Sequence, residues 1–351
     1  MADARASMPA APTAPSVAVT PEASTLEAVL RVEDLHVHFP LRGGIGRRRR
    51  VARAVDGVSF DVRRGEILAL VGESGCGKTT IARTVTGLVR PTSGRVSYRG
   101  QDLGRMRGGD LRRLRQKVQL VFQDPYESLD PRQSVFDIVA EPLIIHGLEP
   151  DRAARRERVL SALAASGLHP PELIARRYPH HLSGGQRQRV AIAAALVLEP
   201  ELIVADEPVS MLDVSVRAEI LRLLLDLRAI RALTFLFITH DLSLAWVIAD
   251  RIAVVYLGRI VEIGPADEVI NQPRHPYTKS LVSVIPVPEP GVRRNRLLLV
   301  GETPSPIAIP TGCRFAPRCW LRRQLGDPVA CLTLDPTLSG DDAHRVACHF
   351  A

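Results

Sequence analysis

The stretch that most limits what this chain can fold into is EILALVGESGCGKTTIARTVTGL, residues 66–88. It combines a short apolar strand, a glycine-rich turn and a helix. The turn has the spacing Gly72-x4-Gly77-Lys78-Thr79, whose glycines let successive backbone N–H groups curl around a phosphate. The start of a helix favours bound anions as well. The stretch therefore predicts a phosphate-binding loop (the P-loop, 72–80) after a buried strand.

Further apolar runs predict a mostly parallel sheet of the P-loop NTPase, RecA-like type. Helical stretches separate most of these runs, and alternation of strands with helices is typical of parallel sheets covered on both faces. Alternating polar and apolar positions elsewhere indicate antiparallel β elements. We therefore predict an α/β fold with further strands at 29–39, 51–62, 117–124, 201–208, 233–240, 251–258 and 259–264.

Composition divides the chain into a tail, a nucleotide-binding domain and an extension. Residues 1–27 are rich in Ala, Pro, Ser and Thr and lack the apolar segment of a secretory signal, which predicts a disordered tail. Residues 28–286 form the predicted domain, and prolines punctuate a helical subdomain inserted into it at about 125–187. From 287 to 351 the pattern breaks into Pro, Arg and Cys, which indicates a separate C-terminal extension.

The chain carries a net charge of +8, almost all of it from arginine. Such a surface suits nucleic acid or an anionic membrane, and a GC-rich genome that favours arginine explains it equally well. No apolar run approaches the roughly 18 residues of a membrane helix. We therefore expect a cytoplasmic protein that can still work at a membrane.

Polar side chains follow three of the predicted strands at their carboxyl ends. Asp206 and Glu207 end the run LIVADE, Gln123 ends VQLVFQ, and His240 ends FLFITH. Ligands of open α/β sheets bind at this edge. Oxygen ligands suit Mg²⁺, so we expect Thr79, Gln123 and Asp206 to hold the metal while Glu207 polarises an attacking water. A lone His at such a place is more often an ordinary polar residue, but here four groups converge.

Six motifs occur in an order that is close to diagnostic. They are the P-loop 72–80 (Walker A), Gln123 (Q-loop), LSGGQ at 182–186 (signature), LIVADE (Walker B), SMLD at 210–213 (D-loop) and His240 (switch). With these motifs, the chain strongly resembles the ATP-binding subunits of ABC transporters over residues 29 to about 350. The resemblance implies an ATPase that uses ATP and Mg²⁺.

The resemblance also assigns residues to the nucleotide. Lys78 is expected to place its charge on the β- and γ-phosphates, and Cys76 to be present for its small size rather than its thiol. Phe39 aligns with the aromatic residue that stacks on adenine, although a plain core role is the alternative. The nucleotide set is Phe39, Gly72, Glu73, Ser74, Gly75, Cys76, Gly77, Lys78, Thr79 and Thr80, and the catalytic set is Glu207, His240 and Gln123.

In this family two ATPase domains pair head to tail, so that each ATP lies between one P-loop and the signature of the other domain. The resemblance therefore implies that Ser183, Gly184, Gly185 and Gln186 serve the ATP of a partner, across an interface that includes Asp213 of the D-loop. One P-loop and one signature make half of two sites. We expect this chain to work only as part of a dimer.

Longer stretches are similar to the ATPases of di- and oligopeptide importers, whose relatives carry nickel or glutathione. They are VFQDPYESLDPRQSV, EPVSMLDVSVRAEIL, HPYTKSLVSVIP and VGETPSPIAIPTGCRFAPRC, the last similar to the F-type subunit. This similarity implies a D-type ATPase as heterodimer partner, two membrane permeases, an extracytoplasmic peptide-binding protein and a peripheral place on the cytoplasmic face of the plasma membrane, with no nucleic acid. The alternative is a soluble ABC ATPase, but such chains mostly carry two cassettes or a long coiled-coil insertion.

Four cysteines crowd the end of the chain, with the spacing Cys313-x5-Cys319-x11-Cys331-x16-Cys348. A reducing compartment disfavours disulfides, so the group is a metal site or a set of spare thiols. Zinc usually takes closely spaced cysteine pairs, which are missing, and the spacing matches no common ferredoxin run. Similar tails in the subfamily are associated with a [4Fe–4S] cluster, so the resemblance favours a structural cluster over zinc or no metal.

Overall fold

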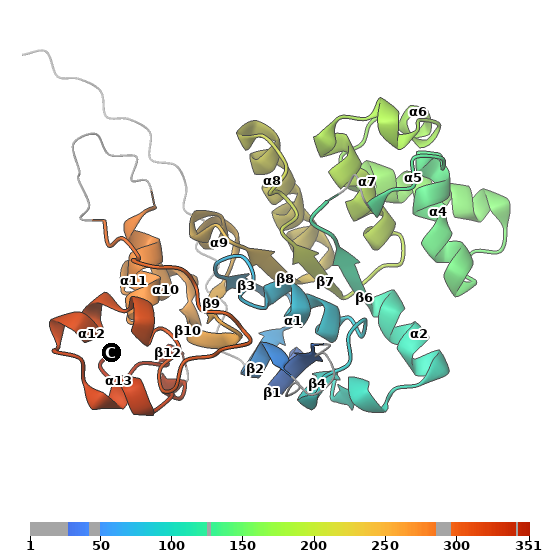
Figure 1. Ribbon diagram of the computed structural model, residues 1–351. Helices are drawn as coiled ribbons and strands as arrows, with labels where there is room; N and C mark the ends of the chain where they lie inside the picture. Colours follow the sequence, from blue (N-terminus) through green and yellow to red (C-terminus); the bar gives the residue numbers. More distant parts are fainter. Residues whose placement is uncertain (1–26, 42–49, 125–127, 286–295, 342) are drawn as a thin grey trace, which may run out of the picture.

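The computed structural model of the chain describes residues 27–41, 50–124, 128–285, 296–341 and 343–351. The predicted tail lies almost wholly outside these residues, as do the start of the predicted helical subdomain and the start of the predicted extension. The described chain contains a large sheet and a small one, with helices on both faces of the large sheet (Figure 1). None of its described helices combines the length and apolar composition needed to span a bilayer.

The large sheet has eight strands in the order β11-β12-β10-β9-β3-β8-β7-β6. The five strands from β9 to β6 run parallel, whereas β10, β12 and β11 continue the sheet in antiparallel pairs. The predicted mostly parallel sheet with antiparallel elements is therefore confirmed. Its strands are β3 (Ile67–Val71), β6 (Val118–Val121), β7 (Leu202–Asp206), β8 (Thr234–Thr239), β9 (Arg251–Tyr256), β10 (Arg259–Pro265), β11 (Ser339–Gly340) and β12 (Arg345–Val346).

The small sheet is antiparallel throughout and has the order β2-β1-β4-β5. Its two long strands, β1 and β2, alternate buried and exposed residues because one face packs on the domain core. The strands are β1 (Ala28–Pro40), β2 (Val51–Arg63), β4 (Ser93–Tyr98) and β5 (Gln101–Asp102).

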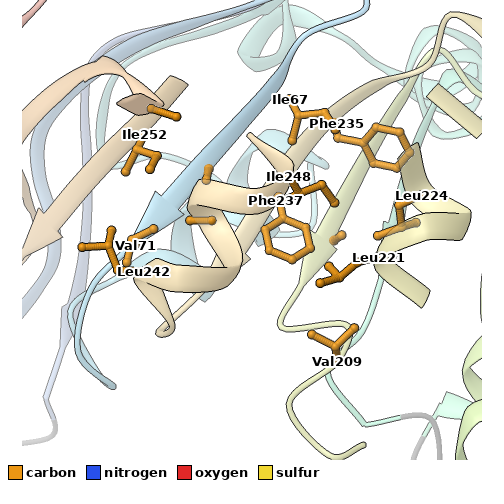
Figure 2. Close-up of a cluster of buried hydrophobic side chains, with 14 of the residues drawn as sticks. Ile67, Val71, Val209, Leu221, Leu224, Phe235, Phe237, Leu242, Ile248 and Ile252 are labelled. Carbon is orange, nitrogen blue, oxygen red and sulfur yellow. The ribbon is translucent and has the colours of Figure 1, made fainter. Parts of the chain in front are cut away.

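Strand β3 is buried on both sides, and its alternate residues enter two different cores. Ile67, Ala69 and Val71 pack against helices on one face of the large sheet, where they meet side chains of β8, α8 and α9 (Figure 2). Leu68 and Leu70 point to the other face and pack with α1 and the small sheet. A strand buried on both faces has no polar alternation, which explains the continuous apolar run ILALV.

The helices divide between the two faces of the sheet and an outlying group. Helix α1 lies between the two sheets, whereas α8 to α11 cover the opposite face of the large sheet. The helices are α1 (Lys78–Val85), α2 (Gly108–Lys117), α4 (Val135–His146), α5 (Arg152–Ala165), α6 (Pro171–Ala175), α7 (Gly184–Leu196), α8 (Val214–Arg231), α9 (Leu242–Ile248), α10 (Ala266–Asn271), α11 (Pro276–Ser283), α12 (Trp320–Gln324) and α13 (Val329–Thr333), with 3₁₀ turns η1 (Leu103–Arg105), η2 (Pro179–His181) and η3 (Ala316–Arg318).

Helices α4 to α7 form the outlying group and share a core of their own (Figure 1). Helix α7 belongs to two cores, because Val190 and Ala193 pack among these helices while Ile192 and Leu196 pack against the large sheet. The signature helix is thus the connection between the outlying helices and the sheet. The predicted subdomain limits of 125–187 stay a prediction.

The C-terminal extension does not form the separate unit that its composition indicated. Strand β12 pairs with β10, so residues near the end of the chain extend the large sheet. Phe315 is 1% exposed and packs against Tyr256 and Tyr277 within the main core. The extension folds onto the domain because its few apolar residues suffice to complete a larger core but not to build one alone.

Candidate functional site

Strand β3 delivers the P-loop to the edge of the sheet, and α1 begins directly after it. Gly77 is the last residue before α1 and has a φ of 109°, a left-handed conformation that favours glycine. Within the loop, the Cys76 N–H donates to the Glu73 carbonyl (3.3 Å). The Cys76 carbonyl accepts from the Gly258 N–H (2.9 Å), which connects the loop to a neighbouring turn. This geometry presents a helix N-terminus to an anion.

Lys78 lies beneath the P-loop and is almost fully buried. Its Nζ donates to the carbonyls of Gly72 (2.7 Å) and Glu73 (3.0 Å). The Cys76 sulfur is 3.7 Å from the same Nζ, and burial raises the pKa of this thiol. A protonated, enclosed thiol agrees with the interpretation that Cys76 is present for its size.

The carboxyl ends of β6, β7 and β8 bring the predicted catalytic groups together. Glu207 Oε2 accepts from Gln123 Nε2 (3.2 Å) and lies 3.0 Å from His240 Nδ1. One residue earlier, Asp206 Oδ1 accepts from the Thr79 hydroxyl (3.3 Å) of α1. Five residues from four separate segments of the sequence thus meet at one edge of the sheet.

Gln123 does not end a strand as the sequence indicated. Strand β6 lies at the edge of the sheet and stops at Val121, where its pairing with β7 ends at Ala205. Gln123 therefore lies on a loop two residues beyond the strand, from which its amide still contacts Glu207.

Asp206 and Glu207 place two carboxyl groups side by side near the P-loop. Burial raises the pKa of Asp206, and the nearby charge of Glu207 raises it further. The hydrogen bond from Thr79 lowers it, but by less than burial raises it. A divalent cation would offset both the burial of the Asp206 carboxylate and its repulsion from Glu207. A hydroxyl together with a carboxylate is a donor set that Mg²⁺ accepts. The donor set therefore fits Mg²⁺ beside the phosphates.

Thr79 and Glu207 line one cavity of about 620 Å³, whereas Asp206 does not. Most of the predicted P-loop residues and all three predicted catalytic residues lie on its wall, whereas Phe39, Gly72 and Cys76 do not. Leu281 and Pro306 also line it, although the sequence did not predict them. The full lining is Ala54, Glu73, Ser74, Gly75, Gly77, Lys78, Thr79, Thr80, Gln123, Glu207, His240, Leu281 and Pro306.

The signature lies outside this cavity. Ser183 begins α7 and forms a reciprocal cap with Gln186, in which each side chain accepts from the backbone N–H of the other. Asp213 caps α8 by accepting from the Val216 N–H (3.0 Å), without a reciprocal bond. Ser183, Gly184, Gly185 and Gln186 do not line the cavity.

Comparison with known proteins identifies the family. Residues 55–210 match the family described as ABC transporter, and residues 261–325 match the oligopeptide/dipeptide transporter C-terminal region. The dipeptide transport ATP-binding protein DppF of Escherichia coli is 47% identical over 329 residues, which cover 94% of this chain and 96% of the relative. The oligopeptide transport ATP-binding protein OppF of Salmonella typhimurium is 44% identical, with 92% and 96% covered. The chain belongs to the ABC transporter ATP-binding proteins. It is an ATPase that binds ATP and Mg²⁺.

Solved structures of ABC cassettes confirm the fold of this ABC ATPase. The cassette MJ0796, solved as a dimer in a post-hydrolysis state with ADP and Pi, has a TM-score of 0.60 and 29% identity, and the match covers 68% of this chain and 98% of that one. The cbiO1 protein of Clostridium perfringens gives the same score and identity, with 70% and 92% covered.

Phe39 of the ABC ATPase is 43% exposed, so the alternative of a plain core residue is wrong. It pairs with Ala52 across β1 and β2, two residues from the cavity-lining Ala54. Its stacking on adenine stays a prediction.

The four C-terminal cysteines are free thiols around one small cavity. Burial raises the pKa of each thiol. It raises the pKa of Cys313 to about 12, and the other three thiols add to the rise at Cys313. Among the described residues, three or more ligand atoms of His, Cys, Asp or Glu lie within 4.8 Å of one another only at His36, His38 and Asp56. No three of the described cysteine sulfurs therefore lie within 4.8 Å of one another, whereas all four around a single tetrahedral zinc are about 3.8 Å apart.

Two arginines between the first two cysteines reach the ATPase core, and the sequence reasoning missed both. Arg314 forms a buried ion pair with Asp56, which also accepts from His36 and His38. Arg318 forms an ion pair with Glu73 of the P-loop. The signal available was the run CRFAPRC, in which each arginine directly follows or precedes a cysteine.

Proposed function

We propose that this chain is the ATP-hydrolysing subunit that energises import of di- and oligopeptides through an ABC transporter. The observation that carries hydrolysis is Glu207, held by Gln123 and His240 at the wall of the P-loop cavity. The names of the similar proteins, which span nearly the whole chain, support peptides as the cargo. Nickel or glutathione as cargo of the same machinery is the alternative.

Each residue of the site has a proposed role. Lys78 and the N–H groups of the P-loop bind the phosphates, and Phe39 stacks on adenine. Mg²⁺ is held by Thr79, Gln123 and Asp206 and balances the phosphate charge. Glu207 takes the proton of the attacking water, and His240, 3.0 Å away, orients that carboxylate.

The ATP site is completed by a second ATPase of the D type. The signature residues from Ser183 to Gln186 would contact the γ-phosphate of that partner's ATP, and Asp213 would lie at the interface. Their distance from the chain's own cavity supports this arrangement. The pair would dock on two permeases from the cytoplasmic face of the plasma membrane, with a peptide-binding protein on the outside.

The C-terminal cysteines would hold a [4Fe–4S] cluster with a structural role. Four enclosed thiols that raise one another's pKa need a cation to become thiolates, and no three of the described sulfurs lie as close together as around one zinc ion. Oxygen-free purification should give a broad visible absorption with about four irons per chain. The Cys331→Ser variant should lose this absorption, whereas Cys76→Ser should keep it. A colourless, iron-free protein from oxygen-free cells would contradict the cluster.

Affinity purification of the Glu207→Gln protein from native membranes with Mg-ATP tests the cargo. We expect two permeases, a second ATPase and a peptide-binding protein, identified by mass spectrometry, and we expect the same sample in Mg-ADP to lose the binding protein. The ligand of that binding protein then distinguishes peptides from nickel and glutathione. Recovery of ribosomes or nucleic acid instead would overturn the transport proposal and leave the ATPase chemistry intact.

A further inference from the structure

The second residue of the P-loop, Glu73, is held from outside the loop by Tyr277 of α11 and by Thr303 and Arg318 of the C-terminal extension. Arg318 donates to both carboxylate oxygens of Glu73, with NH1 to Oε2 at 2.8 Å and NH2 to Oε1 at 3.2 Å. The Thr303 hydroxyl also donates to Oε2. The backbone N–H of Glu73 donates to the Tyr277 hydroxyl (3.1 Å). Both the side chain and the backbone of one P-loop residue are therefore fixed from outside the loop, the side chain by the C-terminal extension and the backbone by Tyr277 of α11.

This contact is shielded from water. The side chain of Arg318 is only 8% exposed and that of Glu73 28%, and the guanidinium lies 6.0 Å from the centre of the Tyr256 ring. Burial alone would raise the pKa of Glu73, but the hydrogen bonds from Arg318 and Thr303 hold it below its ordinary value. The two-pronged pair is thus charged, and such pairs fix direction as well as distance.

Glu73 connects this pair to the phosphate site. Its carbonyl accepts from Lys78 Nζ at 3.0 Å, and Lys78 lines the cavity. A chain of contacts therefore runs from Arg318 through Glu73 to the ammonium group that meets the phosphates. The tail approaches the cavity at a second point, because Pro306 lines it and its carbonyl accepts from the Arg53 N–H (3.0 Å).

We propose that Arg318 is a positioning residue for the P-loop, acting with Thr303 and Tyr277 to preset Glu73 and Lys78 for the phosphates of ATP. The tail is then part of the nucleotide site rather than an appendage. Arg318 does not line the cavity, whereas the proposed catalytic residues do. We therefore expect Arg318 to act on the binding of ATP and to leave the chemical step unchanged.

The Arg318→Met variant tests this proposal because it keeps the length of the side chain and removes the guanidinium. We expect the Kd and KM for Mg-ATP to rise about tenfold, within the usual range of coupling between linked sites, while kcat changes less than about twofold. The Arg318→Lys variant keeps the charge without the two-pronged geometry and should fall between wild type and Arg318→Met. Binding is measured with a fluorescent ATP analogue and turnover by phosphate release.

Arg322→Met is the matched control. Arg322 lies in the same extension and pairs with Asp327 (2.8 Å), so its loss removes a tail ion pair that does not touch the P-loop. We expect its Kd and kcat to equal those of the wild type. Thr303→Val is a milder test should Arg318→Met fail to fold, and it should raise the Kd in the same direction.

Hydrogen exchange supplies a reading that a purely structural role would not produce. If Arg318 links the tail to the P-loop, then ATP binding must stabilise that link in return, because coupling is reciprocal. We expect Mg-ATP to slow exchange at residues 313–319 in the wild type and in Arg322→Met, and to have no such effect in Arg318→Met. An unchanged Kd in a folded Arg318→Met or Thr303→Val protein, or an equal rise in Arg322→Met, would overturn the proposal.

Discussion

Replacing Glu207 with Gln is expected to abolish ATP turnover while leaving ATP binding nearly intact. Gln has the same shape and still offers an oxygen to Gln123 and His240, but it cannot take a proton from water. General-base catalysis contributes about 10²- to 10⁴-fold, so kcat should fall by that factor. Phosphate release measures the loss, and titration with a fluorescent ATP analogue measures binding.

The matched control is Glu201→Gln. Glu201 precedes the same strand β7 at its opposite end, where it accepts from the Tyr98 hydroxyl (2.6 Å) and pairs with Arg99, away from the cavity. This variant should hydrolyse ATP at the wild-type rate. Turnover of Glu207→Gln close to that of the wild type would show that Glu207 is not the base.

The second large effect is expected from Gly77→Ala, compared with Gly75→Ala. Both glycines have positive φ, 109° and 78°, so an added Cβ meets similar backbone strain of about 1–2 kcal/mol at both. Only at Gly77 would the Cβ also lie 2.2 Å from a backbone oxygen, that of Ala54, whereas Gly75 faces open space. Gly77→Ala must therefore move the P-loop or β2.

We expect Gly77→Ala to lose ATP affinity at least about tenfold more than Gly75→Ala, which corresponds to about 1.4 kcal/mol of additional cost. Titration of both variants with the same fluorescent nucleotide measures the difference, and circular dichroism checks that both are folded. Equal losses in the two variants would mean that strain alone, and not the contact with Ala54, sets the cost.

Most of the ATP site was predictable from the sequence because its residues either lie within one short motif or end a strand. The P-loop is contiguous, and its bounding strand and helix are where the glycine spacing requires them. Asp206 and His240 end or follow buried parallel strands, and parallel strands carry their ends to one edge. The topology alone then brings these groups together, whatever the details of packing.

Other features of the site were beyond sequence reasoning. The apolar pattern VQLVFQ continues past Val121, but the pairing of β6 with β7 ends there, and the strand ends with it. The position of Phe39 near the end of β1 is compatible with either a buried or an exposed side chain. Only the packing of the small sheet shows that it is exposed. A hydrophobic pattern indicates which residues tend to be buried, but not which neighbours they contact in the fold.

The sequence by itself determined the phosphate loop, the strand-end carboxylates and the membership of the ABC family, since each depends on short spacings or on strand order. Only the tertiary structure decided that the C-terminal tail contacts the P-loop and the wall of its cavity. The Arg318–Glu73 pair joins residues 245 positions apart, and the Arg314–Asp56 pair residues 258 apart. Such pairs exist only because Phe315 and β12 first fold the tail onto the core, and no local pattern encodes which charge a folded tail will meet.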